Sequence, residues 1–188
     1  LAFERHYQEK AEELSTLRNN AASQLAAAVE VEMQTLGMPD GRFTIKLSAN
    51  GNNEPHPNGL EQLEFLVSAN PGQPLKALAK VASGGELSRI SLAIQVITAQ
   101  TSRVPTLVFD EVDVGIGGPT AEVVGQLLRK LGDRGQVLTV THLPQVAACA
   151  DHHLVVAKQR SAAGSASTVT PVEQENRIRE VARMLGGE

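Results

Sequence analysis

The segment Ser83-Gly84-Gly85-Glu86 has the composition of an anion-binding site. It precedes a stretch with helical periodicity, so its backbone N–H groups and the helix N-terminus would point at one spot. That end of a helix carries a partial positive charge and unsatisfied donors, which suit an anion such as a phosphate group. The adjacent glycines allow a close approach that a Cβ would block. The same residues are also typical of an ordinary helix entrance capped by serine, and the segment alone does not separate the two interpretations.

Two adjacent carboxylates, Asp110 and Glu111, end an apolar run that predicts a strand over residues 106–110. Open α/β sheets bind ligands at the carboxyl ends of their strands, which is where this pair would lie. An aspartate there can hold Mg²⁺, usually through water. The next carboxylate can orient and deprotonate the water that attacks a γ-phosphate. The alternative is a pair of solvated acids at a strand end, because charged side chains are mostly exposed.

A histidine, His142, follows the next predicted strand, over residues 137–141. One helical crossover joins the two strands, so both strand ends would lie at the same edge of a parallel sheet. His142 could then contact a γ-phosphate oxygen beside Asp110 and Glu111. A single histidine is more often a surface residue, but this one accompanies a carboxylate pair. Together the three segments predict one part of an ATP site.

The phosphate loop of such a site is absent from the sequence. No Gly-x-x-x-x-Gly-Lys-Ser/Thr motif occurs in the 188 residues, so the lysine that reaches the β- and γ-phosphates is missing. The chain also begins with Leu1 rather than methionine, in the middle of a helical pattern. We therefore expect a piece of a longer protein, whose other part supplies the phosphate loop.

A long helix precedes these segments. Apolar residues recur at steps of three and four from Phe3 to about Leu36, where Gly37 and Pro39 predict the end of the helix. A helix of that length would extend about 50 Å, which favours a partner helix. We predict the end of a coiled-coil arm over residues 1–36, followed by a globular lobe over residues 37–188. The alternative is a surface helix packed on the domain.

The remaining pattern predicts an α/β fold. Alternation over residues 43–47 and 63–67 indicates a hairpin whose loop, over residues 51–59, is rich in Asn, Pro and Gly and is expected to be flexible. Helices are expected from Gly85 to about Gln100, over 119–131, over 144–150 and over 175–185, the last ending at Gly186-Gly187. A second hairpin is expected over 154–158 and 168–172, around a low-complexity loop at 161–167. The strands after residue 105 are apolar on both faces, as in a parallel sheet covered by helices.

The composition sets the context of these motifs. A net charge of -4 and a pI near 5.8 give no overall electrostatic case for nucleic-acid binding, although a local basic patch remains compatible with them. The single cysteine, Cys149, excludes a disulfide within the chain and favours a reducing compartment. No apolar run approaches the length that spans a bilayer, and no signal-peptide pattern opens the chain.

Three runs together resemble the signature, Walker B and switch-histidine regions of SMC-like ATPases, which carry ABC-type nucleotide sites. The runs are Ser83-Gly84-Gly85-Glu86-Leu87-Ser88-Arg89, Val108-Phe109-Asp110-Glu111-Val112-Asp113 and Thr141-His142-Leu143-Pro144-Gln145-Val146-Ala147. The resemblance covers essentially the whole chain. It is strongest to bacterial members that act in DNA double-strand-break repair, because of residues 114–118 and 142–147.

The resemblance implies a fold and a set of roles. The fold would be the C-terminal lobe of an ABC/SMC-type P-loop ATPase head, preceded by the coiled-coil helix. Asp110 would coordinate Mg²⁺, Glu111 would be the general base, and His142 would be the switch histidine. Ser83, Gly84 and Gly85 would contact the γ-phosphate of ATP bound on the opposing subunit, and Glu86 and Asp113 are carried over as residues of the same nucleotide site.

Two positions depart from the pattern of ABC proteins. Ala82 replaces the leucine that usually precedes the signature serine, a change that should leave the backbone donors in place. Gly117 stands where the D-loop usually ends in an aspartate, whereas Asp113 matches the second acid of the SMC-type Asp-Glu-Val-Asp run. Coupling between paired sites is therefore expected to differ from that in transporters.

The function expected from the resemblance is ATP hydrolysis to ADP and phosphate between two paired heads, which gates the holding of broken DNA ends, single- or double-stranded. The expected partners are the N-terminal lobe of the same protein, a second head and DNA, but no membrane. The setting would be the bacterial cytoplasm, at the nucleoid, in recombination and the SOS response to DNA damage. Two alternatives remain: a structural clamp or dimerisation module, and another SMC-like ABC ATPase without a repair role.

Overall fold

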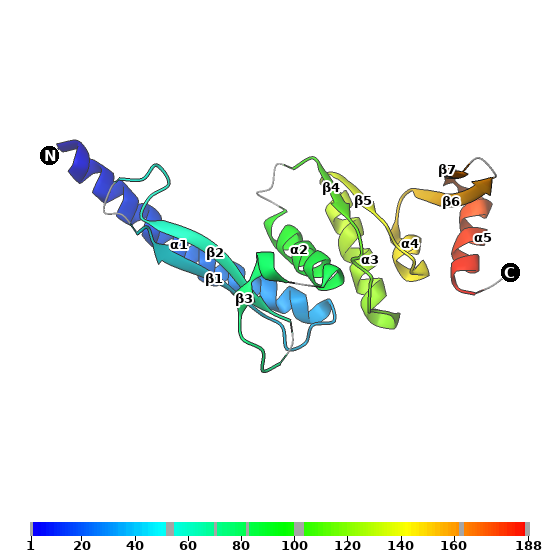
Figure 1. Ribbon diagram of the computed structural model, residues 1–188, viewed down its shortest axis with the longest axis horizontal. Coiled ribbons are helices and arrows are strands. Elements are labelled where there is room, and N and C mark those ends of the chain that lie inside the picture. The colour runs from blue at the N-terminus through cyan, green and yellow to red at the C-terminus, as the bar shows by residue number, and fades with distance from the viewer. Residues whose placement is uncertain are drawn as a thin grey trace. The chain divides into compact units, whose positions relative to one another are not determined.

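The computed structural model describes residues 2–51, 55–69, 71–81, 83–99, 104–161 and 164–186 (Figure 1). The chain divides into two compact units, Leu1–Gln100 and Thr101–Glu188, each of which is described by itself. The helix end expected at about Gln100, the departure at Ala82 and the second glycine of the expected helix stop, Gly187, lie outside the described residues. None of the described helices combines the length and the apolarity needed to cross a membrane.

The first unit is built on the helix α1 (Ala2–Thr35), as the sequence predicts. Gly37 follows it with a φ of 79°, a conformation that glycine adopts readily at the end of a helix. The C-terminal part of α1 is anchored by fully buried apolar side chains, namely Val29, Met33 and Leu36. In contrast, Phe3, Leu17 and Val31 are more than half exposed along the same helix.

The predicted hairpin is present beside α1 (Figure 1). Strands β1 (Arg42–Ala49) and β2 (Glu61–Ser68) pair antiparallel, with Phe43 opposite Val67. The rings of Phe43 and Phe65 lie 5.6 Å apart at their centres and contribute to the core of this unit. A third strand, β3 (Lys76–Ala77), pairs with β2, and the 3₁₀ helix η1 (Leu78–Lys80) follows it.

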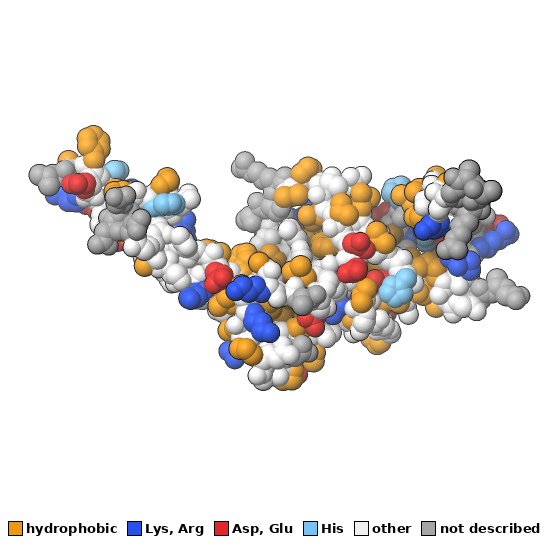
Figure 2. Space-filling view, viewed as in Figure 1, with side chains coloured by type: hydrophobic (Ala, Val, Ile, Leu, Met, Phe, Trp, Pro, Cys, Tyr) orange, Lys and Arg blue, Asp and Glu red, His pale blue; other side chains and the backbone are white. Residues whose placement is uncertain are grey.

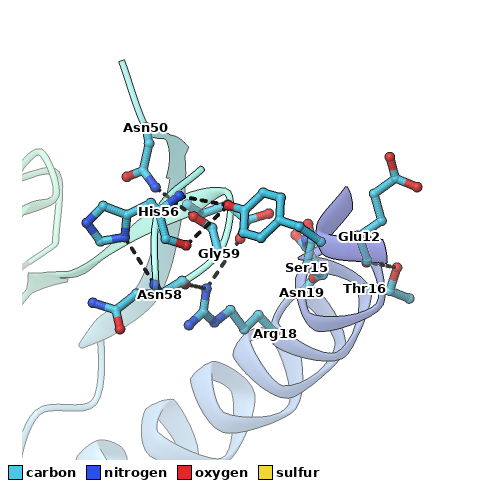
Figure 3. A network of polar contacts seen from close by, with 11 residues as sticks. Glu12, Ser15, Thr16, Arg18, Asn19, Asn50, His56, Asn58 and Gly59 are labelled. Atoms are coloured by element: carbon cyan, nitrogen blue, oxygen red, sulfur yellow. Dashed lines mark hydrogen bonds and ion pairs between the residues drawn. The ribbon is translucent and has the colours of Figure 1, made fainter. Parts of the chain in front are cut away.

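The loop between β1 and β2 is tied to α1 over its described residues (Figure 3). The hydroxyl of Tyr7 donates to the carbonyl of His56 at 3.1 Å and accepts from the N–H of His56 at 2.9 Å. Arg18 donates to the carbonyl of Asn58 at 2.7 Å and lies 3.5 Å from the carboxylate of Glu61. The expectation of a flexible loop is therefore wrong for residues 55–59, because side chains of the helix satisfy their backbone polar groups.

The second unit begins with two parallel strands joined by a helix. Strands β4 (Thr106–Phe109) and β5 (Gln136–Thr139) pair directly, and the crossover helix α3 (Gly118–Gly132) and the short helix α4 (Pro144–Cys149) pack together. The buried side chains of α3 include Val124, Leu128 and Leu131. Close packing of α3 on α4 depends on Gly125, where a Cβ would lie 2.8 Å from the Sγ of Cys149.

Within this unit, one face of the β4–β5 pair carries exposed apolar side chains. Val108, Leu138 and Val140 alternate with buried or half-buried neighbours and are 68, 45 and 62% exposed. Figure 2 shows apolar side chains exposed in this region of the molecule. The apolar pattern that predicted this sheet is present, and helix α3 packs against β5 within the unit.

The chain ends in a second hairpin and a helix. Strands β6 (His153–Ser161) and β7 (Gly164–Val172) pair antiparallel, with Lys158 opposite Ser167. The prediction of a loop over residues 161–167 is therefore wrong for residues 164–167, which belong to β7. Their low-complexity sequence does not prevent this, because strands pair through hydrogen bonds between backbone groups rather than through particular side chains. Helix α5 (Gln174–Met184) follows, and its Arg177 donates to the carbonyls of Ala148 and Ala150 near the end of α4.

Candidate nucleotide site

The glycine pair of the first motif opens helix α2 (Gly84–Thr98), in the first unit. Ser83 is the N-cap, and its Oγ accepts from the N–H of Glu86 at 3.4 Å. Glu86 lies in the first turn, where a negative charge interacts favourably with the helix dipole. The serine thus performs the ordinary capping role, and of the two glycines Gly84 is exposed and Gly85 is buried.

One charged residue of this helix was not singled out by the sequence. Arg89 is only 7% exposed, on the second turn of α2. Burial lowers the pKa of its guanidinium, and the charge of Glu86 opposes that effect. The only sequence signal is the spacing of Glu86 and Arg89, which places the two charges on one face of the helix. That spacing does not predict that Arg89 is buried.

The second unit brings the other motifs to one edge of its sheet. Because Phe109 and Thr139 are partners in the parallel register, the residues that follow them leave the sheet side by side. The N–H of Val140 continues the pairing by donating to the carbonyl of Phe109 at 2.9 Å. Asp110 and Glu111 are exposed at the end of β4, and the His142 side chain, beyond β5, is 67% exposed.

Glu111 has a strained backbone. Its φ is 58°, in the left-handed region that residues other than glycine rarely adopt. Its N–H donates to Oδ1 of Asp110 at 2.9 Å, and its carbonyl accepts from the N–H of Val114 at 3.2 Å, which closes a turn. Strained backbone of this kind is concentrated at functional sites, where the surrounding structure holds it in place.

Asp113 is placed differently from the other two acids. Its side chain is 1% exposed, and its Oδ2 accepts hydrogen bonds from the hydroxyl of Thr141 and from the N–H groups of His142 and Leu143 at 3.1 and 3.3 Å. The Nδ1 of His142 lies 3.4 Å from the same oxygen. Sequence reasoning placed Asp113 in the nucleotide site and gave no sign that it would be buried.

The exposed acidic residues at the end of β4 suit Mg²⁺ better than a metal ion that needs a cage of protein ligands. Among the described residues, no group of three or more His, Cys, Asp and Glu side chains could enclose a metal ion. Mg²⁺ does not require such a cage, since proteins usually hold it through one or two carboxylates while water and phosphate oxygens complete its shell. An exposed aspartate at a strand end, as Asp110 is, fits that requirement.

The chain is similar in sequence to DNA repair proteins named RecN. It is 54% identical to that of Vibrio cholerae over 94% of the chain, 50% identical to that of Xylella fastidiosa strain 9a5c over 96%, and 42% identical to that of Streptomyces coelicolor over 95%. These alignments cover 32, 32 and 33% of the three relatives, so the chain spans about a third of their length. No protein-family model matches the chain.

Solved structures with the same fold are SMC head domains. The Smc head with a coiled coil and joint from Pyrococcus yayanosii matches 93% of this chain and 31% of its own, with a TM-score of 0.63 and 22% identity. A structure described under ATP-driven dimerization and DNA-stimulated activation of SMC ATPases matches 93% of this chain and 99% of its own, with a TM-score of 0.53 and 18% identity. The predicted fold, one lobe of an SMC-type head with a long helix, is confirmed.

Proposed function

We propose that this chain is one lobe of a RecN-like ATPase, which binds and hydrolyses ATP between paired heads to hold DNA ends during double-strand-break repair by recombination. The parallel register of β4 and β5 carries the proposal, because it delivers Asp110, Glu111 and His142 to one sheet edge. That edge is where α/β sheets bind ligands. The similarity to RecN proteins supports the choice of repair over other SMC-like roles.

The residues take the following roles in this proposal. Asp110 contributes a carboxylate to Mg²⁺, which when bound would neutralise charge on the phosphate oxygens. Glu111 orients the attacking water and accepts its proton, and His142 contacts the γ-phosphate from the neighbouring strand end. Catalysis then depends on positioning and charge stabilisation rather than on a covalent intermediate.

The signature segment acts on a second head. Ser83, Gly84 and Gly85 would present the N-terminus of α2 to the γ-phosphate of ATP held by the other subunit, with Glu86 in the same turn. The hydroxyl of Ser83 already caps the helix, so the segment would bind mainly through backbone N–H groups. Nucleotide bound in this way would join two heads, which makes ATP the switch for their pairing.

A partner lobe is needed to complete the head. Exposed apolar side chains at Val108, Leu138 and Val140 support a partner that covers this face of the sheet. We propose that the partner is the N-terminal lobe of the same protein, which supplies the phosphate loop. Residues 1–36 would be the end of the arm that connects the lobes, and residues 37–188 the lobe itself. The chain alone is then expected to show no ATPase activity.

The ATPase role is tested by Glu111→Gln in the intact protein. Loss of the base should lower kcat about 10²- to 10⁴-fold while ATP binding and head pairing persist. Glu122→Gln, an exposed glutamate on α3, is the matched control and should leave the rate unchanged. Wild-type turnover by Glu111→Gln, measured as phosphate release, would exclude Glu111 as the base.

The DNA role is tested separately, because the acidic chain gives no electrostatic support for it. If DNA ends are the substrate, linear duplex should raise the ATPase rate of the intact protein more than a covalently closed circle of the same sequence. Equal rates with both would argue against recognition of ends. No effect of either DNA would favour a clamp module, or an ATPase outside repair, over the function proposed. If the protein acts on broken chromosomes, it would be located at the nucleoid in the cytoplasm. It would then take part in the SOS response to DNA damage.

A further inference from the structure

Among the described residues, Asp113 is the acidic residue with a buried side chain, and three hydrogen-bond donors surround one of its oxygens. The donors are the hydroxyl of Thr141 and the N–H groups of His142 and Leu143, and the ring Nδ1 of His142 lies 3.4 Å from the same oxygen. All of them come from the segment that follows β5. A carboxylate withdrawn from water is tolerated when donors surround it in this way.

The segment after β5 connects the strand to α4, and the carbonyl of Leu143 at its end accepts from the N–H groups of Val146 and Ala147. The strand ends at Thr139 and α4 begins at Pro144, so residues 141–143 lie between two elements. The N–H of Leu143 also donates to the hydroxyl of Thr141 at 3.0 Å, which joins both residues to the same carboxylate. Buried N–H groups need acceptors, and Asp113 supplies the acceptor for two consecutive residues here.

Asp113 also belongs to the turn that carries the proposed metal ligand and base. The turn is closed by the Val114 N–H to the Glu111 carbonyl, and Val112, next to Asp113, is fully buried and anchors it in the core. One carboxylate therefore joins the turn after β4 to the segment after β5. The exposed side chains of Glu111 and His142 lie on the two segments that it joins.

We propose that Asp113 is a positioning residue that fixes the backbone of His142 beside Asp110 and Glu111, and that it acts on turnover through this segment rather than by contact with nucleotide. The effect on turnover rests on the ATPase function proposed above. The effect on the segment does not depend on that function, so the two parts can fail independently.

Amide hydrogen exchange in the intact protein tests the effect on the segment. In Asp113→Ala, a peptide spanning residues 140–147 should exchange at least about tenfold faster than in wild type, because two N–H groups lose their acceptor. Asp113→Asn keeps one acceptor oxygen and should give an intermediate rate. Asp133→Ala, an exposed acid after α3, is the control and should match wild type. Wild-type exchange in both Asp113 variants overturns the proposal.

Steady-state kinetics of the same variants test the effect on turnover. Misplacement of His142 should lower kcat, by up to about 100-fold in Asp113→Ala, and change KM for ATP less than about threefold. Asp113→Asn should recover part of the rate. If Asp113→Ala unfolds, the kinetics of Asp113→Asn and Thr141→Val test the effect on turnover instead. Thr141→Val removes one hydrogen-bond donor and leaves the charge of Asp113 in place. Faster exchange with unchanged kcat in an active enzyme overturns the proposal, whereas an inactive wild type contradicts only the ATPase function.

Discussion

Replacement of Glu111 by glycine should not destabilise the protein, although glycine usually does. The φ of 58° at this exposed position costs a residue with a Cβ about 1–2 kcal/mol. Glycine removes that cost but adds about 0.5–1 kcal/mol of conformational entropy to the unfolded chain. The two effects leave Glu111→Gly between neutral and about 1.5 kcal/mol more stable than wild type.

The same substitution at Glu122 is the matched control. This exposed residue lies inside α3, where glycine costs about 1 kcal/mol relative to good helix formers. The change also removes the hydrogen bond from Gln126 to the Glu122 carboxylate, 3.2 Å long and worth a few tenths of a kcal/mol (roughly 0.2–0.5). The free energies of unfolding of the two variants should therefore differ by about 1–3 kcal/mol, with Glu111→Gly the more stable.

Unfolding in urea, followed by circular dichroism at the helical band, measures this difference. The chain has no Trp and a single Tyr, so intrinsic fluorescence would report poorly on it. Equal losses of stability at Glu111 and Glu122 would refute the inference that the turn holds Glu111 in a strained conformation. In the intact protein, Glu111→Gly should also abolish ATP hydrolysis, which would show that the strain is retained for the side chain it presents.

Two further predictions concern the stability of the second unit. Hydrogen bonding from Arg183 lowers the pKa of Glu180 below its ordinary value of 4.5, so the stabilisation is present above that pH and is lost as the pH falls through the lowered pKa. In thermal melts between about pH 3 and pH 7, the fall in Tm at low pH should therefore be smaller in Glu180→Gln than in wild type. Gly125→Ala should lower the free energy of unfolding in urea by about 1–3 kcal/mol, because its Cβ would lie 2.8 Å from Sγ of Cys149. Gly132→Ala is the control, and it should be neutral or slightly stabilising because no atom lies within 4 Å of the new Cβ.

The sheet edge that carries Asp110, Glu111 and His142 could be predicted from sequence because it follows from simple rules. Two apolar strands joined by one helix pair in parallel, and the residues after Phe109 and Thr139 must then leave at one edge. The sequence also predicted the helices α1 to α5 and the two hairpins, but not the 3₁₀ helix η1. Strand β3 could not be predicted, since its two residues, Lys76–Ala77, have no periodicity and are ordered by the edge of β2.

Contacts between segments that are distant in the sequence could not be predicted from it. Nothing in the local pattern shows that Tyr7 and Arg18 satisfy the backbone of the β1–β2 loop, because that depends on where the hairpin lies along α1. The burial of Asp113 was hidden for the same reason. A run of three acids within four residues predicts a solvated turn, and only the folded chain shows that one of them faces inward.

The three acids of this turn are separated by environment rather than by residue type. Val112 and Asp113 are buried together, 0 and 1% exposed, and this fixes the second half of the turn in the core. The chain must leave β4 at Phe109 and enter that arrangement at Val112 within two residues, and the positive φ occurs at the second of them, Glu111. The buried anchor thus accounts both for the strain at Glu111 and for the order of the His142 segment. On this view, the inward acid sets the geometry in which the two exposed acids work.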